Sequence, residues 1–308
     1  MAAQSRQDLL VRAMPAVFVV IWSTGFIVAR YGMPHAPPFK FLAVRYGLSV
    51  VCFLAWAFAA RAAWPRSGSQ WAHLAVTGVF MHAGYLGGVW AAVKEGMGAG
   101  LSALLVGLQP VLTALWVSSW GGRVTARQWG GLALGLAGLL LVVWQKLGFG
   151  EVHPANLLMA IVALLAITAG TLYQKRFVQP CDVRTANLVQ LAAAFVVTLP
   201  IALVEPEAMR WFVDGRLNGQ LVGAMAWSVL GLTLGGSSLL YLLIQRGAAT
   251  AVTSLMYLVP PTTAVMAWAL FDEPFTPAIV AGVALTAVGV SLVVRAPAAA
   301  RTFFRSQP

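Results

Sequence analysis

Residues 125–143 read TARQWGGLALGLAGLLLVV, and residues 276–294 read TPAIVAGVALTAVGVSLVV. Each stretch begins with a threonine and leads into an apolar run. A helix needs about 20 such residues to cross the hydrocarbon core of a bilayer. About ten apolar runs of ~18–25 residues, separated by short polar connectors, make up most of the chain. The sequence therefore predicts an all-α membrane protein and leaves no room for a soluble domain.

The composition supports this interpretation. Only 9% of the 308 residues are charged and 60% are hydrophobic, whereas an ordinary globular protein has roughly 25% charged residues. A soluble protein with so few charges could not cover its surface with polar groups. We predict ten transmembrane helices, at about residues 14–32, 39–60, 70–93, 98–120, 127–145, 154–175, 184–204, 218–244, 248–271 and 276–294.

Basic residues are distributed unevenly between the two sets of connectors. Thirteen Lys and Arg lie on the side that holds the N-terminus and six on the other side, and Arg45 inside a span completes the total of 20. Because cytoplasmic loops carry the excess of Lys and Arg, both termini are predicted to be cytoplasmic. The net charge of +11 then reflects topology, and we expect no nucleic-acid partner.

The two quoted stretches are related by a shift of 151 residues, which aligns 107–143 with 258–294. Identical pairs at this shift include Pro110/Pro261, Thr125/Thr276, Gly131/Gly282, Ala133/Ala284, Leu134/Leu285 and Gly138/Gly289. A five-span unit used twice inserts in opposite orientations because five is odd, and such inverted halves are common in transporters. We therefore predict two inverted five-helix repeats, 14–145 and 154–294; chance similarity between apolar helices is the alternative.

Several short motifs are spread along the chain: WSTGF at 22–26, Arg45, GLSALLVGLQP at 100–110, GTLYQKRF at 170–177, the stretch 255–261, and DEPFT at 272–276. In this order and spacing they resemble EamA-type members of the drug/metabolite transporter superfamily, over nearly the whole length. The resemblance implies a ten-helix transporter of small metabolites, often an exporter, in a bacterial inner membrane. Members often carry an acid before the fifth span as well as the tenth, whereas this chain has GGRVT at 121–125.

Two ionisable side chains inside predicted spans are candidates for substrate binding. Arg45 has no Asp or Glu within any span to pair with, and an intramembrane arginine costs ~2.5–3.5 kcal/mol on insertion scales. Its planar fork of donors suits a carboxylate, although snorkelling to the headgroups is the alternative. His82 could couple transport to protons or could be a packing residue. Asp272 and Glu273 precede the last span, and we interpret them as structural, because acids stabilise helix N-termini.

Aromatic and polar side chains complete the predicted site. Trp22, Phe26, Tyr85 and Tyr257 are expected to form cavity walls, with packing or lipid contact as the alternative. Ser23 and Gln109 are polar residues within spans and are further candidates, with interhelical hydrogen bonding as the alternative. Proline breaks at corresponding places of the two halves point to a transporter's site and hinges. The predicted hinge residues are Pro110, Pro260 and Pro261.

Other classes of function fit less well. An aspartyl protease of the membrane needs two Asp within spans, and there are none; no cluster of Cys and His suits a metal. A channel would show a ring of charges or a filter motif, and the sequence has neither. We expect no enzyme, no metal and no cofactor. The prediction is a secondary active exporter of amino acids, related metabolites or amphiphilic drug-like compounds, with a passive channel or facilitator as the alternative. We expect a monomer and leave a homodimer open.

Overall fold

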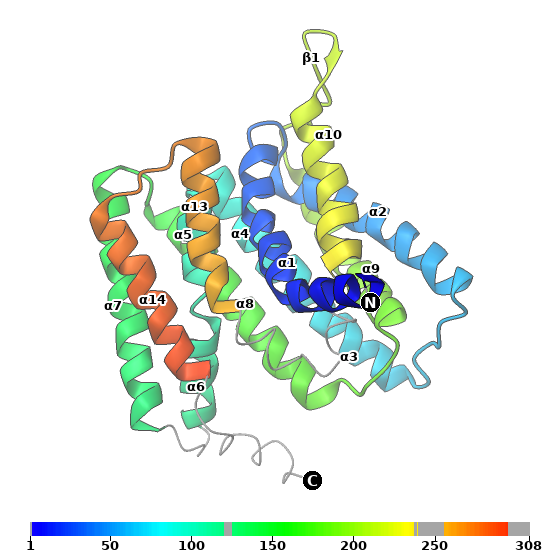
Figure 1. The fold of residues 1–308 in the computed structure, drawn as a ribbon. Helices are drawn as coiled ribbons and strands as arrows, with labels where there is room; N and C mark the ends of the chain where they lie inside the picture. Colours follow the sequence, from blue (N-terminus) through cyan, green and yellow to red (C-terminus); the bar gives the residue numbers. More distant parts are fainter. Residues whose placement is uncertain (1, 120–124, 237–238, 240–255, 295–308) are drawn as a thin grey trace.

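The computed structural model describes residues 2–119, 125–236, 239 and 256–294, and it is almost entirely helical (Figure 1). The helices are α1 (Ala2–Gly32), α2 (Pro38–Ala59), α3 (Gly68–Gly78), α4 (Tyr85–Lys94), α5 (Ala99–Val106), α6 (Gln109–Ser119), α7 (Ala126–Gly148), α8 (Pro154–Phe177), α9 (Val183–Val204), α10 (Gly219–Ala226), α13 (Val259–Phe271) and α14 (Pro277–Val294). A small hairpin of β1 (Phe212–Val213) and β2 (Arg216–Leu217) projects from one end of the bundle (Figure 1).

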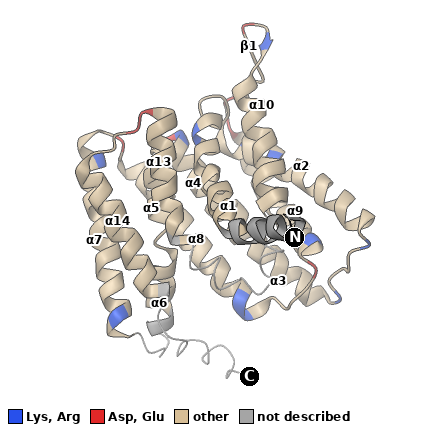
Figure 2. Ribbon diagram, in the orientation of Figure 1, with Lys and Arg blue, Asp and Glu red and all other residues tan. Residues whose placement is uncertain are grey.

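The helices have the composition of membrane spans. Within the described residues, five are long and apolar enough to cross a bilayer, and five more apolar segments are shorter. Figure 2 shows Lys, Arg, Asp and Glu at helix ends and in loops, while the helix bodies are almost free of charge. This arrangement follows from the cost of placing an ionised side chain in hydrocarbon. The prediction of an apolar helical membrane protein is therefore confirmed.

Two helices differ in extent from the predicted spans. Helix α1 begins at Ala2, and its apolar part, Ala16–Gly32, agrees with the span predicted at about 14–32. The predicted helix 98–120 is divided into α5 and α6 by a break at Gly107 and Leu108. Pro110 follows in the first turn of α6, where its missing N–H costs no helical hydrogen bond. The predicted segments 218–244 and 248–271 lie partly outside the described residues.

Two π-helical segments interrupt otherwise regular helices. The segment η1 (Val79–Gly84) joins α3 to α4, and η2 (Trp227–Gly235) continues α10. A short 3-10 turn, η3 (Met256–Leu258), precedes α13. In π-helical turns the hydrogen bond runs over five residues, which widens the helix, and such turns are frequent at functional sites.

Helices α7 and α14 pack closely and run in opposite directions (Figure 1). The backbone of Gly131 lies against Gly289, and that of Gly138 lies against Gly282, so the residue order is reversed between the two helices. A Cβ on Gly138 would meet the Gly282 carbonyl well inside contact distance. Small residues allow this approach, as in other membrane helix pairs.

Helices α2 and α9 form a second antiparallel pair. The Thr185 hydroxyl, near the start of α9, donates to the Ala63 carbonyl beyond the end of α2 at 2.8 Å. At the other end, the Glu205 carboxylate accepts hydrogen bonds from the N–H groups of Phe39 (3.0 Å) and Lys40 (2.7 Å). Glu205 therefore caps the N-terminus of α2, where backbone donors have no helical partner.

Glu273 has a similar capping role, on a helix other than the one expected. Its carboxylate accepts from the N–H groups of Ala99 (2.7 Å) and Gly100 (3.4 Å), at the start of α5. The buried Lys146 amine lies 3.7 Å from the same carboxylate and 2.8 Å from Glu151. Glu273 thus stabilises the N-terminus of α5 rather than that of α14, to which it is adjacent in sequence.

Candidate functional site

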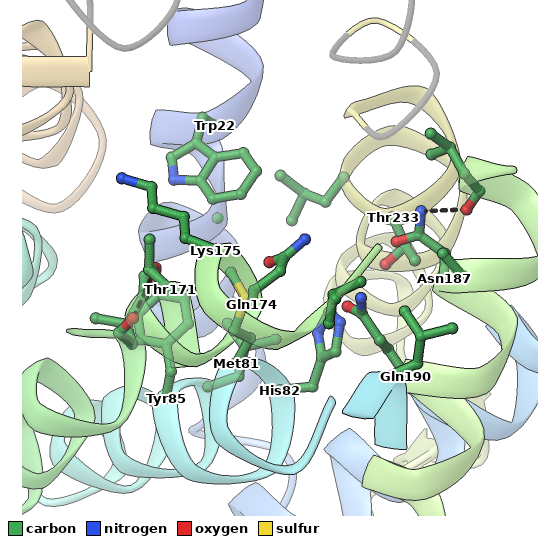
Figure 3. Close-up of a pocket in the computed structure, with 18 of the residues that line it drawn as sticks. Trp22, Met81, His82, Tyr85, Thr171, Gln174, Lys175, Asn187, Gln190 and Thr233 are labelled. Atoms are coloured by element: carbon green, nitrogen blue, oxygen red, sulfur yellow. Dashed lines mark hydrogen bonds between the residues drawn. The ribbon is translucent and has the colours of Figure 1, made fainter. Parts of the chain in front are cut away.

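A cavity of about 630 Å³ lies within the bundle. Its described lining comes from α1, α2, α3, η1, α4, α8, α9 and η2 and from the loop that joins α8 to α9. In Figure 3, Trp22 and Tyr85 lie on one side of this space together with Lys175 and Thr171, and the polar side chains of His82, Gln190 and Asn187 lie on the other side. The cavity therefore offers both apolar walls and hydrogen-bonding groups, the usual character of a small-molecule site.

Arg45 borders the cavity and is only 7% exposed. Its Nη2 and Nε atoms donate to the Thr233 hydroxyl at 3.1 and 3.4 Å, and its guanidinium carbon lies 6.0 Å from the centre of the Trp90 ring. Within the described residues it forms no ion pair. A guanidinium has five N–H donors, and within the described part of the chain only two of them have a protein acceptor, the Thr233 hydroxyl.

The π-helical segments position the groups around Arg45. Thr233 lies in η2, and its hydroxyl donates to the Ser228 carbonyl at 2.8 Å, which orients it towards Arg45. The hydroxyl of Tyr46, which follows Arg45 in α2, donates to the His82 carbonyl in η1 at 2.9 Å. Irregular backbone at membrane depth is tolerated where it faces protein or a cavity. Both segments meet this condition.

Five predicted binding residues, which are Trp22, Phe26, Arg45, His82 and Tyr85, border the cavity. Three of them are aromatic and contribute to its apolar wall. Figure 3 shows the His82 ring facing the amide of Gln190. The structure thus brings together residues from α1, α2, η1 and α4 that the sequence analysis considered separately.

The other predicted residues lie elsewhere. Ser23 is fully buried and donates to the carbonyls of Val19 (2.8 Å) and Val259 (3.5 Å), which joins α1 to α13. Gln109 lies behind the cavity wall and donates to the Thr171 hydroxyl at 2.7 Å. The side chain of Tyr257 is outside the described residues.

The predicted hinge prolines occupy the first turns of helices that follow a break. Pro110 is in the first turn of α6, and Pro260 and Pro261 are in that of α13. The two breaks lie side by side, since a Cβ on Gly107 would come within 2.6 Å of the Pro260 ring.

The sequence analysis did not propose several polar residues that line the cavity. Gln174 and Lys175 come from the end of α8, and Asn187 and Gln190 come from α9 (Figure 3). Gln190 is a polar residue in the middle of an apolar span, which is a signal that could have been used. Helices α3 and α9 approach each other closely at this residue, since a Cβ added to Gly78 would collide with the Gln190 backbone. This close approach brings Gln190 to the cavity.

Among the described residues, the cavity extends to the loop between α8 and α9 and is open there. Its lining includes the loop residues Val178, Gln179, Pro180 and Cys181. Cys181 is half-buried, and burial followed by the charge of Asp182 raises the pKa of its thiol. No described lining residue belongs to a loop at the other end of the bundle.

The end of the bundle away from the α8–α9 loop is closed by packed aromatic residues and an ion pair. The rings of Phe41 and Trp90 stack at 4.5 Å, and those of Tyr31 and Phe271 are 4.7 Å apart. Beyond them, the Lys94 amine lies 2.6 Å from the Glu207 carboxylate. A bundle of apolar helices around a cavity is the general arrangement of helical membrane transporters, which place the substrate site between their helices.

Comparison with known proteins identifies the particular family. The profile of the EamA-like transporter family matches residues 13–144 and 155–295. The chain belongs to this family, so it is a membrane transporter. The resemblance noted in the sequence is confirmed.

Curated relatives and one solved structure agree with this assignment. The chain is 25% identical, over 88% of its length and 90% of the relative, to a "Probable amino-acid metabolite efflux pump" of Salmonella typhimurium. It is 24% identical, over 82% and 80%, to the "Uncharacterized inner membrane transporter YedA" of Escherichia coli K12. A protein of known crystal structure, 17% identical, has the same fold with a TM-score of 0.63 over 92% of this chain and 96% of that one.

Proposed function

We propose that this protein is a secondary active transporter that exports small metabolites bearing a negatively charged group across the inner membrane. Two five-helix halves, 14–145 and 154–294, would be inverted relative to each other and would move as bodies around the cavity. The observation that carries the proposal is the buried Arg45 on the wall of a cavity that is open at one end. The other features described below support it.

The helix directions support the inverted halves. Shifting the sequence by 151 residues equates α7 with α14, and these helices run antiparallel. The second helix of each half, α2 and α9, is also an antiparallel pair. Equivalent helices of an inverted repeat must run in opposite directions when they lie side by side. The family profile also matches the chain in two segments with similar bounds.

The helix contacts are consistent with a two-fold relation between the halves. Helix α1 contacts α10 and η2, while its counterpart α8 contacts α3 and η1. Helix α5, which precedes the break of the first half, contacts α13, which follows the break of the second half. The irregular features also correspond, because η1 shifted by 151 residues falls within η2. Pro110 and Pro261 follow the two breaks, and we propose these prolines, with Pro260, as hinges.

The proposed orientation rests on the distribution of basic residues. The loop between α8 and α9, where the cavity opens, lies on the basic side of the chain, next to Lys175, Arg176 and Arg184. By the positive-inside rule this side is cytoplasmic, as would be both termini. The described conformation is then open to the cytoplasm and closed to the outside. A cavity closed at one end supports a carrier over an open channel, and its lining by one chain makes a monomer sufficient.

The proposed substrate class follows from the cavity's chemistry. Arg45 can bind a carboxylate through two parallel hydrogen bonds, and Trp22, Phe26 and Tyr85 can contact an apolar body. Gln190 and Asn187 can accept from or donate to further polar groups. A relative named as an amino-acid metabolite efflux pump is consistent with substrates of this kind and with outward transport.

The test uses three probes with the same phenylalkyl body and different charge. Phenylacetate is an anion, L-phenylalanine a zwitterion and 2-phenylethylamine a cation. Counterflow of each radiolabelled probe is measured in proteoliposomes preloaded with the same unlabelled compound. We expect transport of the two probes that carry a carboxylate and none of the cation.

Arg45→Gln should lower the apparent affinity for the carboxylates by about 10- to 100-fold, since hydrogen bonds to a charged group contribute about 1.5–3 kcal/mol. Arg176→Gln is the matched control. It removes a basic residue on the same side of the protein, at the exposed end of α8, which does not line the described cavity. Equal transport of the cation, or unchanged kinetics in Arg45→Gln, would contradict the proposal.

A further inference from the structure

The positive charge of Arg45 has no compensating negative charge in the protein. The chain's nine acidic residues are Asp8, Glu95, Glu151, Asp182, Glu205, Glu207, Asp214, Asp272 and Glu273. All of them lie near helix ends, in loops or in the polar start of α1. The stretches that the structure does not describe contain no Asp or Glu. No protein carboxylate is therefore available to neutralise Arg45 within the membrane.

The described groups that contact Arg45 leave its charge in place. Thr233 supplies one neutral hydroxyl oxygen, and Trp90 supplies a ring 6.0 Å away. An aromatic face attracts a cation by about 0.5–2 kcal/mol, which is less than the several kcal/mol needed to desolvate an unpaired ion. In the open cavity, water can solvate the remaining donors. This solvation depends on the cavity staying open.

Transport requires the cavity to close on one side before it opens on the other. Closing would remove water from the cavity and would leave the unpaired guanidinium among apolar lining residues such as Trp22 and Leu232. A bound carboxylate offsets the cost, because it pairs with the guanidinium and neutralises its charge. The closed state is therefore stabilised by an anion and opposed when the site is empty.

We propose that the empty carrier does not cross between its two open states, so that the protein works as an exchanger of anions. Each outward step would carry one anionic substrate and each return step another. Net export of one anion would then require uptake of a different one. This inference rests on the proposed function, since it concerns how outward and inward transport through the same cavity are coupled. Arg45 is the residue that prevents the carrier from returning without a bound substrate.

The first test needs no substrate. Cys181 lines the mouth of the cavity, so its reaction with N-ethylmaleimide reports whether the mouth is open. The full-length protein carries Cys52→Ala and is placed in lipid nanodiscs, in buffer without carboxylates. With Arg45 present, we expect Cys181 to react steadily, because the empty carrier stays open to the cytoplasm.

In Arg45→Gln the empty carrier can close, and the labelling rate should fall about tenfold, which corresponds to about 1.4 kcal/mol. Arg45→Lys keeps the charge and should label like the parent, which separates a charge effect from a disturbed fold. Arg176→Gln should also label like the parent. Equal labelling of Arg45→Gln and the parent would overturn the proposal, as would a fall in Arg45→Lys equal to that in Arg45→Gln.

The second test measures flux. In proteoliposomes loaded with radiolabelled phenylacetate, efflux from the parent should be slow into buffer and much faster when unlabelled phenylacetate is outside. Equal efflux under the two conditions would overturn the exchange proposal while leaving anion transport intact. If phenylacetate and L-phenylalanine both fail in counterflow, the proposed substrate class is wrong, and the labelling test still decides whether the charge of Arg45 holds the empty cavity open.

Discussion

At the scale of single residues, the thiol of Cys181 in the loop between α8 and α9 has a reactivity that depends on its neighbours. Asp182 caps α9 by accepting from the Arg184 N–H at 2.9 Å, and its carboxylate pairs with the Arg184 guanidinium at 2.6 Å. The hydrogen bond to Arg184 lowers the pKa of Asp182. The adjacent Cys181 thiol has a raised pKa, caused first by burial and then by the negative charge of Asp182. Because the thiolate is the reactive form, Cys181 should react slowly at neutral pH.

Asp182→Asn should speed the reaction of Cys181 at pH 7.5. The substitution keeps a side-chain oxygen for the helix cap but removes the charge that opposes ionisation, so the pKa of the thiol falls and more thiolate is present. The measurement is the maleimide labelling rate against pH in the Cys52→Ala background.

At a pH well above the pKa of Cys181 in either protein, the labelling rates of the parent and of Asp182→Asn should converge, because the thiol is then fully ionised in both. Asp214→Asn, in the β1–β2 turn, removes a charge far from the loop and serves as the control. A difference that persists at high pH would show that the substitution changed access to the thiol and not its pKa.

At the scale of helices, the contact between α7 and α14 joins the two proposed halves. Thr125 caps α7 with a capping box to Gln128, and Thr276 caps α14 by accepting from the Ile279 N–H at 3.3 Å. The Thr286 hydroxyl of α14 donates to the Gly135 carbonyl of α7 at 3.3 Å. The threonine and glycine identities that the shifted sequence shares thus have structural roles, as helix caps and as points of close backbone contact.

Gly138→Ala should destabilise the protein by about 1–3 kcal/mol, the usual cost of extra atoms in a packed interface. The added methyl would meet both the Gly282 carbonyl and Thr286. The measurement is thermal unfolding of the purified protein in detergent.

Gly130→Ala is a matched control in the same helix, because a Cβ there has no neighbour within 4 Å. It should be neutral or slightly stabilising, since alanine favours a helix over glycine by about 1 kcal/mol. Equal effects of the two substitutions would contradict the close contact between α7 and α14.

At the scale of the whole molecule, ion pairs and caps at the closed end connect the two proposed halves. Lys94 of α4 pairs with Glu207 beyond α9, and Lys40 of α2 donates to the carbonyls of Glu205 (2.7 Å) and Glu207 (2.6 Å). Glu207 is exposed, and its hydrogen bond with Lys94 lowers its pKa. Opening this end would require these contacts to separate, while the α8–α9 end closes.

The proposed topology predicts that α7 and α14 begin on opposite faces of the membrane. In a background without Cys52 and Cys181, Arg127→Cys and Phe275→Cys place exposed thiols at the starts of these helices. In intact cells permeable only at the outer membrane, an impermeant maleimide should label the cysteine at position 275 and not that at 127.

Inverted membrane vesicles should give the reverse pattern. Labelling of both positions from the same face would contradict the inverted halves. Labelling of 127 alone in intact cells would keep the inversion and reverse the predicted orientation.

The sequence by itself determined the helical membrane class, the approximate helix positions, the family resemblance and the isolation of Arg45. These follow from the length of apolar runs and from the types and order of residues, which do not depend on packing. Only the tertiary structure decided which side chains face the cavity: Thr233 meets Arg45 across 188 positions, and Gln190 lies there while Gln109 and Ser23 do not. The physical reason is that a helix that is apolar on all sides has no polar stripe to fix its rotation. Rotation is set instead by close glycine contacts, caps from distant loops and the two π-helical segments.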